Sequence, residues 1–88
     1  MNLELNDVCK TIEGYVVAEF LEGDGEGLTW ASDLIRMGLI DSVSTFRLVT
    51  FLDDQFKIGV DSAELVPENL RTIEKLGQMV LRRRASAP

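Results

Sequence analysis

The chain has 88 residues, a formal net charge of −6, no histidine and one cysteine. This length suits one small domain with a modest core, and the composition excludes a Ser-His-Asp or Cys-His catalytic centre, a cysteine zinc site and an intrachain disulfide. Residues 1–81 carry six basic and fifteen acidic side chains, a net charge of −9, which would repel nucleic acid phosphates and attract basic protein surfaces.

Nothing in the sequence indicates a membrane span or a secretion signal. No apolar run approaches the ~18 residues that a membrane-spanning helix needs, and the N-terminus lacks the basic-then-apolar order of a signal peptide. We therefore expect a cytoplasmic protein that does not insert stably into membranes and does not bind nucleic acid.

Residues 4–20 are predicted to form the first helix, because apolar side chains recur there at three- and four-residue steps: Leu5, Val8, Ile12, Val16 and Phe20. Cys9 and Tyr15 are interpreted as packing residues. The long connection that follows, residues 21–40, begins with a glycine-rich part and is expected to fold back onto the bundle through Leu28, Trp30, Leu34 and Leu39, with a short helical turn over 33–37.

The acidic part of this connection has a second interpretation as a calcium loop. Its spacing matches some EF-hand ligand positions, which are Glu22, Asp24, Glu26, Gly27 and Asp33. The match is poor, because glutamate replaces aspartate at position one, Thr29 replaces an aliphatic residue, and Asp33 is shorter than the usual bidentate glutamate. A solvated loop is favoured, and no metal site is expected.

Residues 43–56 are predicted to form the second helix, with one buried stripe made of Val43, Phe46, Val49, Leu52 and Phe56. The segment Gly38-Leu39-Ile40-Asp41-Ser42-Val43 leads into it. Asp41 could cap the first turn, whose unpaired N–H groups and partial positive charge would stabilise a phosphodiester on the Ser42 oxygen.

A short helix is expected within residues 62–70, and a last helix over 72–83, capped by Thr72 and burying Ile73, Leu76 and Val80. Arg82, Arg83 and Arg84 are interpreted as a solvated helix end that complements the helix dipole, and residues 85–88 are expected to fray. These elements predict an all-α, four-helix bundle with three main helices, one short helix and a long first loop. Residues 1–84 would form its single domain.

Several segments together resemble the acyl and peptidyl carrier protein family, over about residues 5–81. They are Asp33-Leu34, the 38–43 motif, the apolar set Phe46, Leu48, Val49, Leu52 and Phe56, and Asn69-Leu70-Arg71-Thr72-Ile73. The resemblance implies that Ser42 carries 4′-phosphopantetheine from coenzyme A, attached by a Mg-dependent phosphopantetheinyl transferase, with motif support from Gly38, Leu39, Asp41 and Val43. Asp61-Ser62 lacks the Gly-Leu-Ile lead-in and is assigned to capping only.

The resemblance further implies a carrier that presents acyl or aminoacyl thioesters to loading and downstream biosynthetic enzymes. We expect it to be freestanding, because Met1 lies shortly before the first helix and little chain follows the last one, and to be a monomer. The small size and the lack of histidine favour a protein that is not an enzyme. The cargo stays open between fatty acyl, polyketide and aminoacyl groups. We expect partners to contact Asp41, Val43, Arg47 and Asp54, although Arg47 departs from the acidic second helix that carriers often have. The alternative is a small helical interaction module without a prosthetic group, in which Ser42 only caps its helix.

Overall fold

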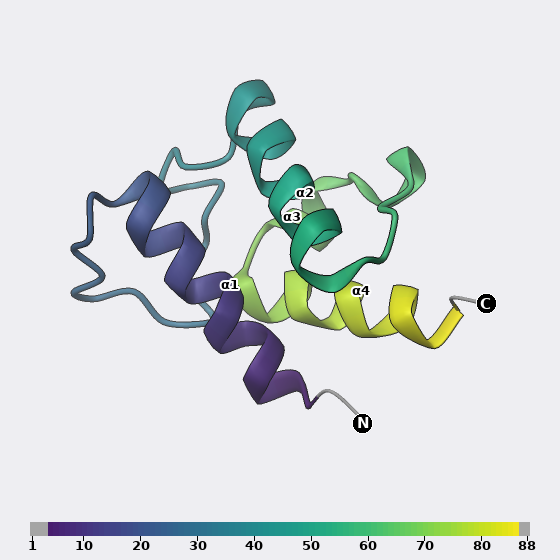
Figure 1. The fold of residues 1–88 in the computed structure, drawn as a ribbon. Coiled ribbons are helices and arrows are strands. Elements are labelled where there is room, and N and C mark those ends of the chain that lie inside the picture. The colour runs from purple at the N-terminus through teal and green to yellow at the C-terminus, as the bar shows by residue number, and fades with distance from the viewer. Residues whose placement is uncertain (1–3, 87–88) are drawn as a thin grey trace.

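The computed structural model describes residues 4–86, and every regular element in that range is helical. The long helices are α1 (Leu5–Phe20), α2 (Ser42–Phe56) and α4 (Ile73–Ser86), and between α2 and α4 lie the 3₁₀ turn η1 (Ser62–Glu64) and the short α3 (Pro67–Leu70). This is the predicted all-α bundle (Figure 1). Within the described residues no helix is long and apolar enough to cross a membrane.

The predicted bounds of the three long helices agree with the structure to within one residue, except at the C-terminal end of α4. That helix continues to Ser86, so the expected frayed tail is helical over its first two residues, and residues 87–88 lie outside the described range. In place of the single short helix expected within residues 62–70, the structure has the two elements η1 and α3. Thr72 caps α4 as predicted, because its hydroxyl oxygen accepts the N–H of Lys75 at 3.0 Å.

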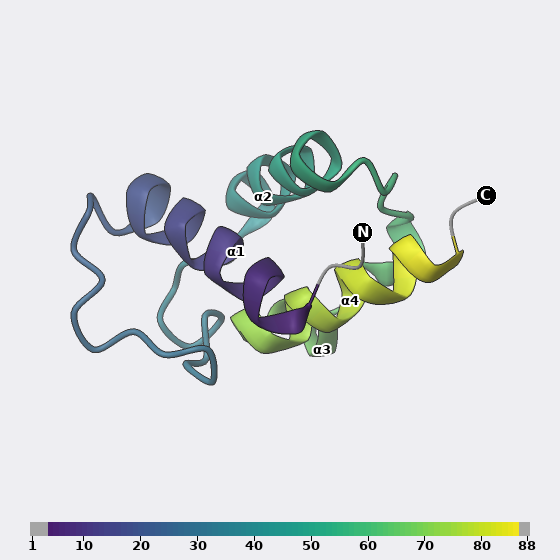
Figure 2. The same ribbon diagram turned by 60° about the horizontal axis from the view of Figure 1, so that its bottom comes forward.

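The core lies where α1 packs on α4 and α2 lies across this pair (Figure 2). Cys9 and Leu34 are fully buried in it, as the sequence predicted. The side chains that fill the core come from all four helices and two connections: Val8, Cys9, Ile12, Val16, Leu34, Leu48, Leu52, Phe56, Ile58, Leu70, Ile73, Leu76, Met79 and Val80.

The predicted buried stripe of α2 is wrong at Val43 and Phe46, and also at Val49, which is only partly buried and stays outside the core. Val43 and Phe46 are 67% and 73% exposed, and the residues of α2 that enter the core are Leu48, Leu52 and Phe56. The start of α2 stands clear of α4 at the top of Figure 1, so the apolar side chains of its first turns are not covered by the other helices. Local periodicity cannot tell which part of such an arc is covered.

The second half of the connection between α1 and α2 is fixed to the segment before α4. The N–H of Leu34 donates to the carbonyl of Arg71 at 2.7 Å, and the N–H of Glu74 donates to the carbonyl of Trp30 at 3.1 Å. The carboxylate of Asp33 pairs with the Arg71 guanidinium at 3.1 Å. The predicted fold-back is confirmed, since Leu28, Trp30 and Leu39 also pack against the core, and it fixes the entry to α2.

Candidate functional site

A capped turn brings the chain to the start of α2. The Asp33 carboxylate accepts the N–H groups of Ile35 and Arg36 at 3.1 and 3.0 Å, and the N–H of Gly38 closes the turn on the carbonyl of Ile35 at 3.0 Å. Gly38 has φ +78°, a backbone conformation that glycine adopts without a steric cost. This is the helical turn expected over 33–37.

The two residues after this turn anchor the motif. Leu39 and Ile40 are partly buried against the core, whereas Asp41, Ser42 and Val43 are exposed. The apolar lead-in therefore holds the backbone down and leaves the Asp-Ser pair at the surface. The glycine and the two apolar residues thus explain locally why Ser42 is exposed.

Asp41 is the N-cap of α2, as predicted. Its carboxylate accepts the N–H of Ser44 at 2.8 Å, and its carbonyl accepts the first helical bond from Thr45 at 2.8 Å. The hydrogen bond from the Ser44 backbone N–H, followed by one from the Ser44 side chain, lowers the pKa of Asp41 below its ordinary value. Asp41 therefore stays ionised at neutral pH beside Ser42.

Ser42 is the first residue of α2, and its hydroxyl makes no hydrogen bond within residues 4–86. Asp41 performs the capping, so the alternative in which Ser42 caps the helix is wrong. Ser42 is thus an exposed residue with an unengaged hydroxyl at the positive end of a 15-residue helix.

An open groove of about 420 Å³ lies beside Ser42. It is mainly apolar and is lined by Ile35, Ile40, Asp41, Ser42, Thr45, Leu65, Pro67 and Leu70. The sequence motif did not point to Leu65, Pro67 and Leu70, which reach the serine only through the fold. A long, flexible arm on the Ser42 oxygen would have apolar surface to rest on here, so the residues present fit a pantetheine substituent.

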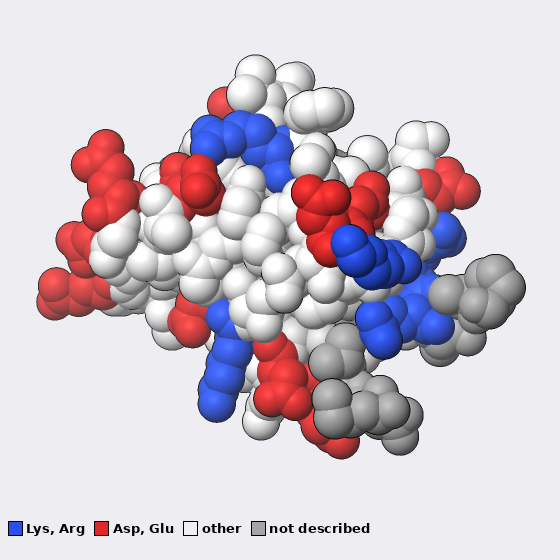
Figure 3. All heavy atoms as spheres, in the orientation of Figure 1, with Lys and Arg blue, Asp and Glu red and all other residues white. Residues whose placement is uncertain are grey.

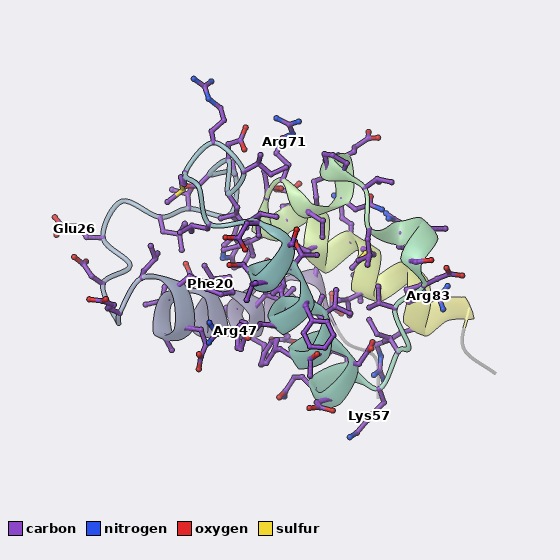
Figure 4. All side chains as sticks on the ribbon, turned by 90° about the horizontal axis from the view of Figure 1, so that it is seen from above. Phe20, Glu26, Arg47, Lys57, Arg71 and Arg83 are labelled. Atoms are coloured by element: carbon purple, nitrogen blue, oxygen red, sulfur yellow. The ribbon has the colours of Figure 1, made fainter. Side chains whose placement is uncertain are left out.

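The four predicted partner residues all lie on or next to α2 but do not form one cluster. Asp41 and Val43 flank Ser42, and Asp54 is exposed near the other end of the helix. Arg47 turns toward α1, where its guanidinium pairs with Glu19 at 2.6 Å and lies 5.6 Å from the Phe20 ring centroid (Figure 4). Sequence reasoning missed Phe46 as a surface residue, because it had placed that side chain in the core.

The three arginines of α4 are not simply solvated. Arg84 donates to the carbonyl of Phe56 at 2.9 Å and Arg83 to the carbonyl of Gly59 at 2.8 Å. Arg82 donates to Asn69 at 3.3 Å and lies 3.5 Å from the Glu64 carboxylate. Basic side chains gather where α4 ends, and acidic ones gather over the loop after α1 (Figure 3). Through Arg83 and Arg84, α4 holds the end of α2 and the loop that follows it.

The calcium interpretation of the acidic loop after α1 is not supported by any cluster of donor groups in the described residues. Among residues 4–86, no three His, Cys, Asp or Glu side chains come together in a way that could hold a metal ion. The Asp24 carboxylate instead accepts the N–H of Glu26 at 3.1 Å, which stabilises a turn.

Comparisons with known proteins agree with this geometry. The family model described as "Phosphopantetheine attachment site" matches residues 16–80, which include the start of α2 and its groove. A protein of Serratia sp. (strain ATCC 39006), named "Probable acyl carrier protein PigG", is 30% identical over 71 residues, covering 81% of this chain and 82% of that protein. The chain therefore belongs to the phosphopantetheine attachment site family, the acyl and peptidyl carrier domains that its serine motif resembles.

Proposed function

We propose that residues 1–84 form one carrier domain that tethers acyl or aminoacyl groups on a 4′-phosphopantetheine arm attached to Ser42. The observation that carries this proposal is the Ser42 hydroxyl itself. It is exposed, makes no hydrogen bond within the described residues, and lies at a helix start beside an apolar groove. The protein would be the substrate of enzymes and not a catalyst.

Attachment requires a phosphopantetheinyl transferase. The Ser42 oxygen bonds to the phosphorus that bears pantetheine, the pyrophosphate bond of coenzyme A breaks, adenosine 3′,5′-bisphosphate leaves, and the hydroxyl proton passes to a base or water. When bound, the arm supplies a thiol that holds cargo as a thioester at high effective concentration. The thiol of the arm stays free only in a reducing compartment, and coenzyme A is found in such compartments. We therefore propose that the protein acts in the cytoplasm.

This chain's own residues would then orient and present the arm. Leu39 and Ile40 fix the backbone before Ser42, and Asp41 keeps the first turn of α2 formed. The groove lined by Leu65, Pro67 and Leu70 offers apolar surface to the arm between reactions. No step of bond making is assigned to these side chains.

Two serines in this chain provide a matched test. Ser42 and Ser62 are both exposed, and both follow an aspartate whose carboxylate accepts a backbone N–H, at 2.8 Å for Asp41 and 3.0 Å for Asp61. Ser42 begins a 15-residue helix and Ser62 a three-residue 3₁₀ turn.

Incubation with coenzyme A, Mg²⁺ and a broad-specificity transferase should add one phosphopantetheinyl group to the wild type and to Ser62→Ala, and none to Ser42→Ala, as measured by intact mass. Modification that persists in Ser42→Ala would refute the site. No modification of the wild type would favour a helical interaction module without a prosthetic group.

Any enzyme that acts on the arm must approach Ser42, so we propose that partners contact Asp41, Val43, Arg47 and Asp54. Phe46 joins this surface, because it lies one turn after Ser42 and is 73% exposed.

Asp54→Lys should raise the KM of a cognate enzyme without changing helicity, and the effect should shrink with added salt. Arg47→Glu should also raise the KM, because it removes a guanidinium that the enzyme is proposed to contact and breaks the ion pair with Glu19 that holds it in place. Wild-type kinetics from both variants would remove these residues from the partner surface.

A further inference from the structure

A second groove follows α2 on the side that faces α1. It has a volume of about 350 Å³ and is lined by Tyr15, Phe46, Arg47, Thr50, Phe51 and Asp54. The rings of Tyr15 and Phe51 stack with centroids 4.0 Å apart and planes 18° apart, and the Tyr15 hydroxyl donates to the carbonyl of Arg47 at 3.1 Å. These contacts fix one aromatic wall of the groove.

Of the two charged side chains that line this groove, one is paired with an opposite charge and the other is not. Arg47 is neutralised by Glu19, whose carboxylate lies 2.6 Å away. Asp54 is exposed and makes no ion pair with any residue in the described range. The groove therefore presents aromatic faces together with one uncompensated negative charge.

Helix geometry places this groove within reach of Ser42. Phe46 follows Ser42 by four residues and so lies one turn along on nearly the same face. At about 1.5 Å per residue, Thr50 and Asp54 lie about 12 and 18 Å further along the axis than Ser42. Ser42 lines the first groove together with Thr45, and Phe46, one turn further along α2, lines the second groove.

The exposure and the charge of the groove favour an amine-bearing cargo over a long alkyl chain. A long alkyl chain gains most from an enclosed apolar cavity, but Phe46, Arg47, Thr50 and Asp54 are all exposed here, and the interior is filled by core side chains. A protonated amine gains from aromatic faces and from a carboxylate. Its hydrocarbon part would at the same time cover Phe46.

We propose that this groove holds the end of a loaded arm when that end is an aminoacyl group, with the protonated amine at Asp54 and the side chain against Phe46 and the Tyr15–Phe51 pair. This inference rests on the proposed attachment to Ser42 and names aminoacyl groups as the cargo class. Because Asp54 also belongs to the proposed partner surface, a docked enzyme would displace the amine from it.

The test loads the ¹⁵N-labelled protein, through the transferase, with coenzyme A analogues whose acyl group is amide-linked and so resists hydrolysis. One analogue carries leucyl, and the other carries 4-methylpentanoyl, which is the same group without the amine. Relative to the unacylated arm, the leucyl form should shift the amide resonances of residues 46–54 at least threefold more than the 4-methylpentanoyl form. In Asp54→Asn this difference should disappear.

The control variant is Glu26→Gln, which also removes one exposed acid but lies on the loop away from α2 (Figure 4). It should respond to leucyl loading as the wild type does. Equal shifts from both analogues, shifts confined to the groove of Ile40, Thr45 and Leu65, no shifts, or shifts that need an added enzyme would each overturn the inference. Intact mass shows whether the wild type was loaded at all, and a failure there refutes the proposed function itself.

Discussion

Gly77 of α4 lies directly against the thiol of Cys9 on α1. A Cβ atom at position 77 would stand 2.7 Å from the Cys9 Sγ and 3.0 Å from a methyl carbon of Leu5, which is closer than real Cβ atoms come to the sulfur. The absence of a side chain at Gly77 therefore allows the two helices to approach as closely as they do.

Gly77→Ala should destabilise the protein although alanine favours helix. Overpacking costs about 1 to 3 kcal/mol, and helix propensity returns about 1 kcal/mol, so the free energy of unfolding should fall by up to about 2 kcal/mol. Gly14→Ala is the matched control, since it too is helical but has open space around the new Cβ. It should raise the free energy of unfolding by about 0.5 to 1 kcal/mol. Denaturant unfolding that ranks these two variants in the opposite order would contradict the close approach.

Phe46→Ala should leave stability nearly unchanged, whereas Leu52→Ala should cost about 2 to 5 kcal/mol. The reason is burial, because Phe46 is 73% exposed and Leu52 is fully buried. Ser42→Ala should also stay within about 0.5 kcal/mol of the wild type, because Asp41 caps the helix. If chemical denaturation found Phe46→Ala as costly as Leu52→Ala, the first turns of α2 would have to pack differently.

Arg84→Ala should lower the free energy of unfolding by about 1 kcal/mol, since it removes the hydrogen bond to the last residue of α2, the carbonyl of Phe56. Lys75→Ala, on the exposed face of the same helix, is the control and should change stability little. Hydrogen exchange should quicken near the end of α2 in Arg84→Ala alone. Unchanged exchange there would mean that this arginine does not hold α2.

Asp33 and Asp41 should make the protein acid-sensitive. The pKa of Asp33 is lowered by the Arg36 backbone N–H and then by Arg71, and that of Asp41 by Ser44, each from an ordinary value of 3.8. A carboxyl whose pKa is lower in the folded state stabilises fully above its unfolded pKa and loses that contribution as the pH falls through the folded pKa. Wild-type stability should therefore fall below about pH 4.

In the double variant Asp33→Asn and Asp41→Asn, stability should be lower at neutral pH and should depend less on pH in this acid range. Urea unfolding at several pH values measures both quantities. A double variant that loses stability with acid as steeply as the wild type would assign the acid sensitivity to other carboxyls.

Much of the fold could be predicted from sequence because its signals are local. Apolar residues repeat along α1, α2 and α4, Thr72 caps α4, and Gly38 with Asp41 marks the start of α2. Each of these features depends on residues within a few positions of one another, so periodicity and capping rules apply directly.

The features of the fold and of the site that could not be predicted depend on contacts between residues that are distant in the sequence. The face of α2 that is buried was predicted incorrectly at Phe46, because Val49 and Leu48 give overlapping helical stripes and only the positions of α1 and α4 decide between them. The two grooves, the Tyr15–Phe51 stack and the bond from Arg84 to Phe56 join segments that are 20 or more residues apart. No spacing rule along the chain contains that information.

Under the proposed function, enzymes contact the exposed beginning of α2, and this surface is separate from the residues that make the protein fold. Val43 and Phe46 contribute almost nothing to the core, and the backbone before them is fixed by Leu39 and Ile40. Substitutions at Val43 and Phe46 can therefore accumulate in evolution with little effect on folding. If enzymes contact this surface as proposed, the start of α2 can adapt to new enzymes while the core on which it rests stays unchanged.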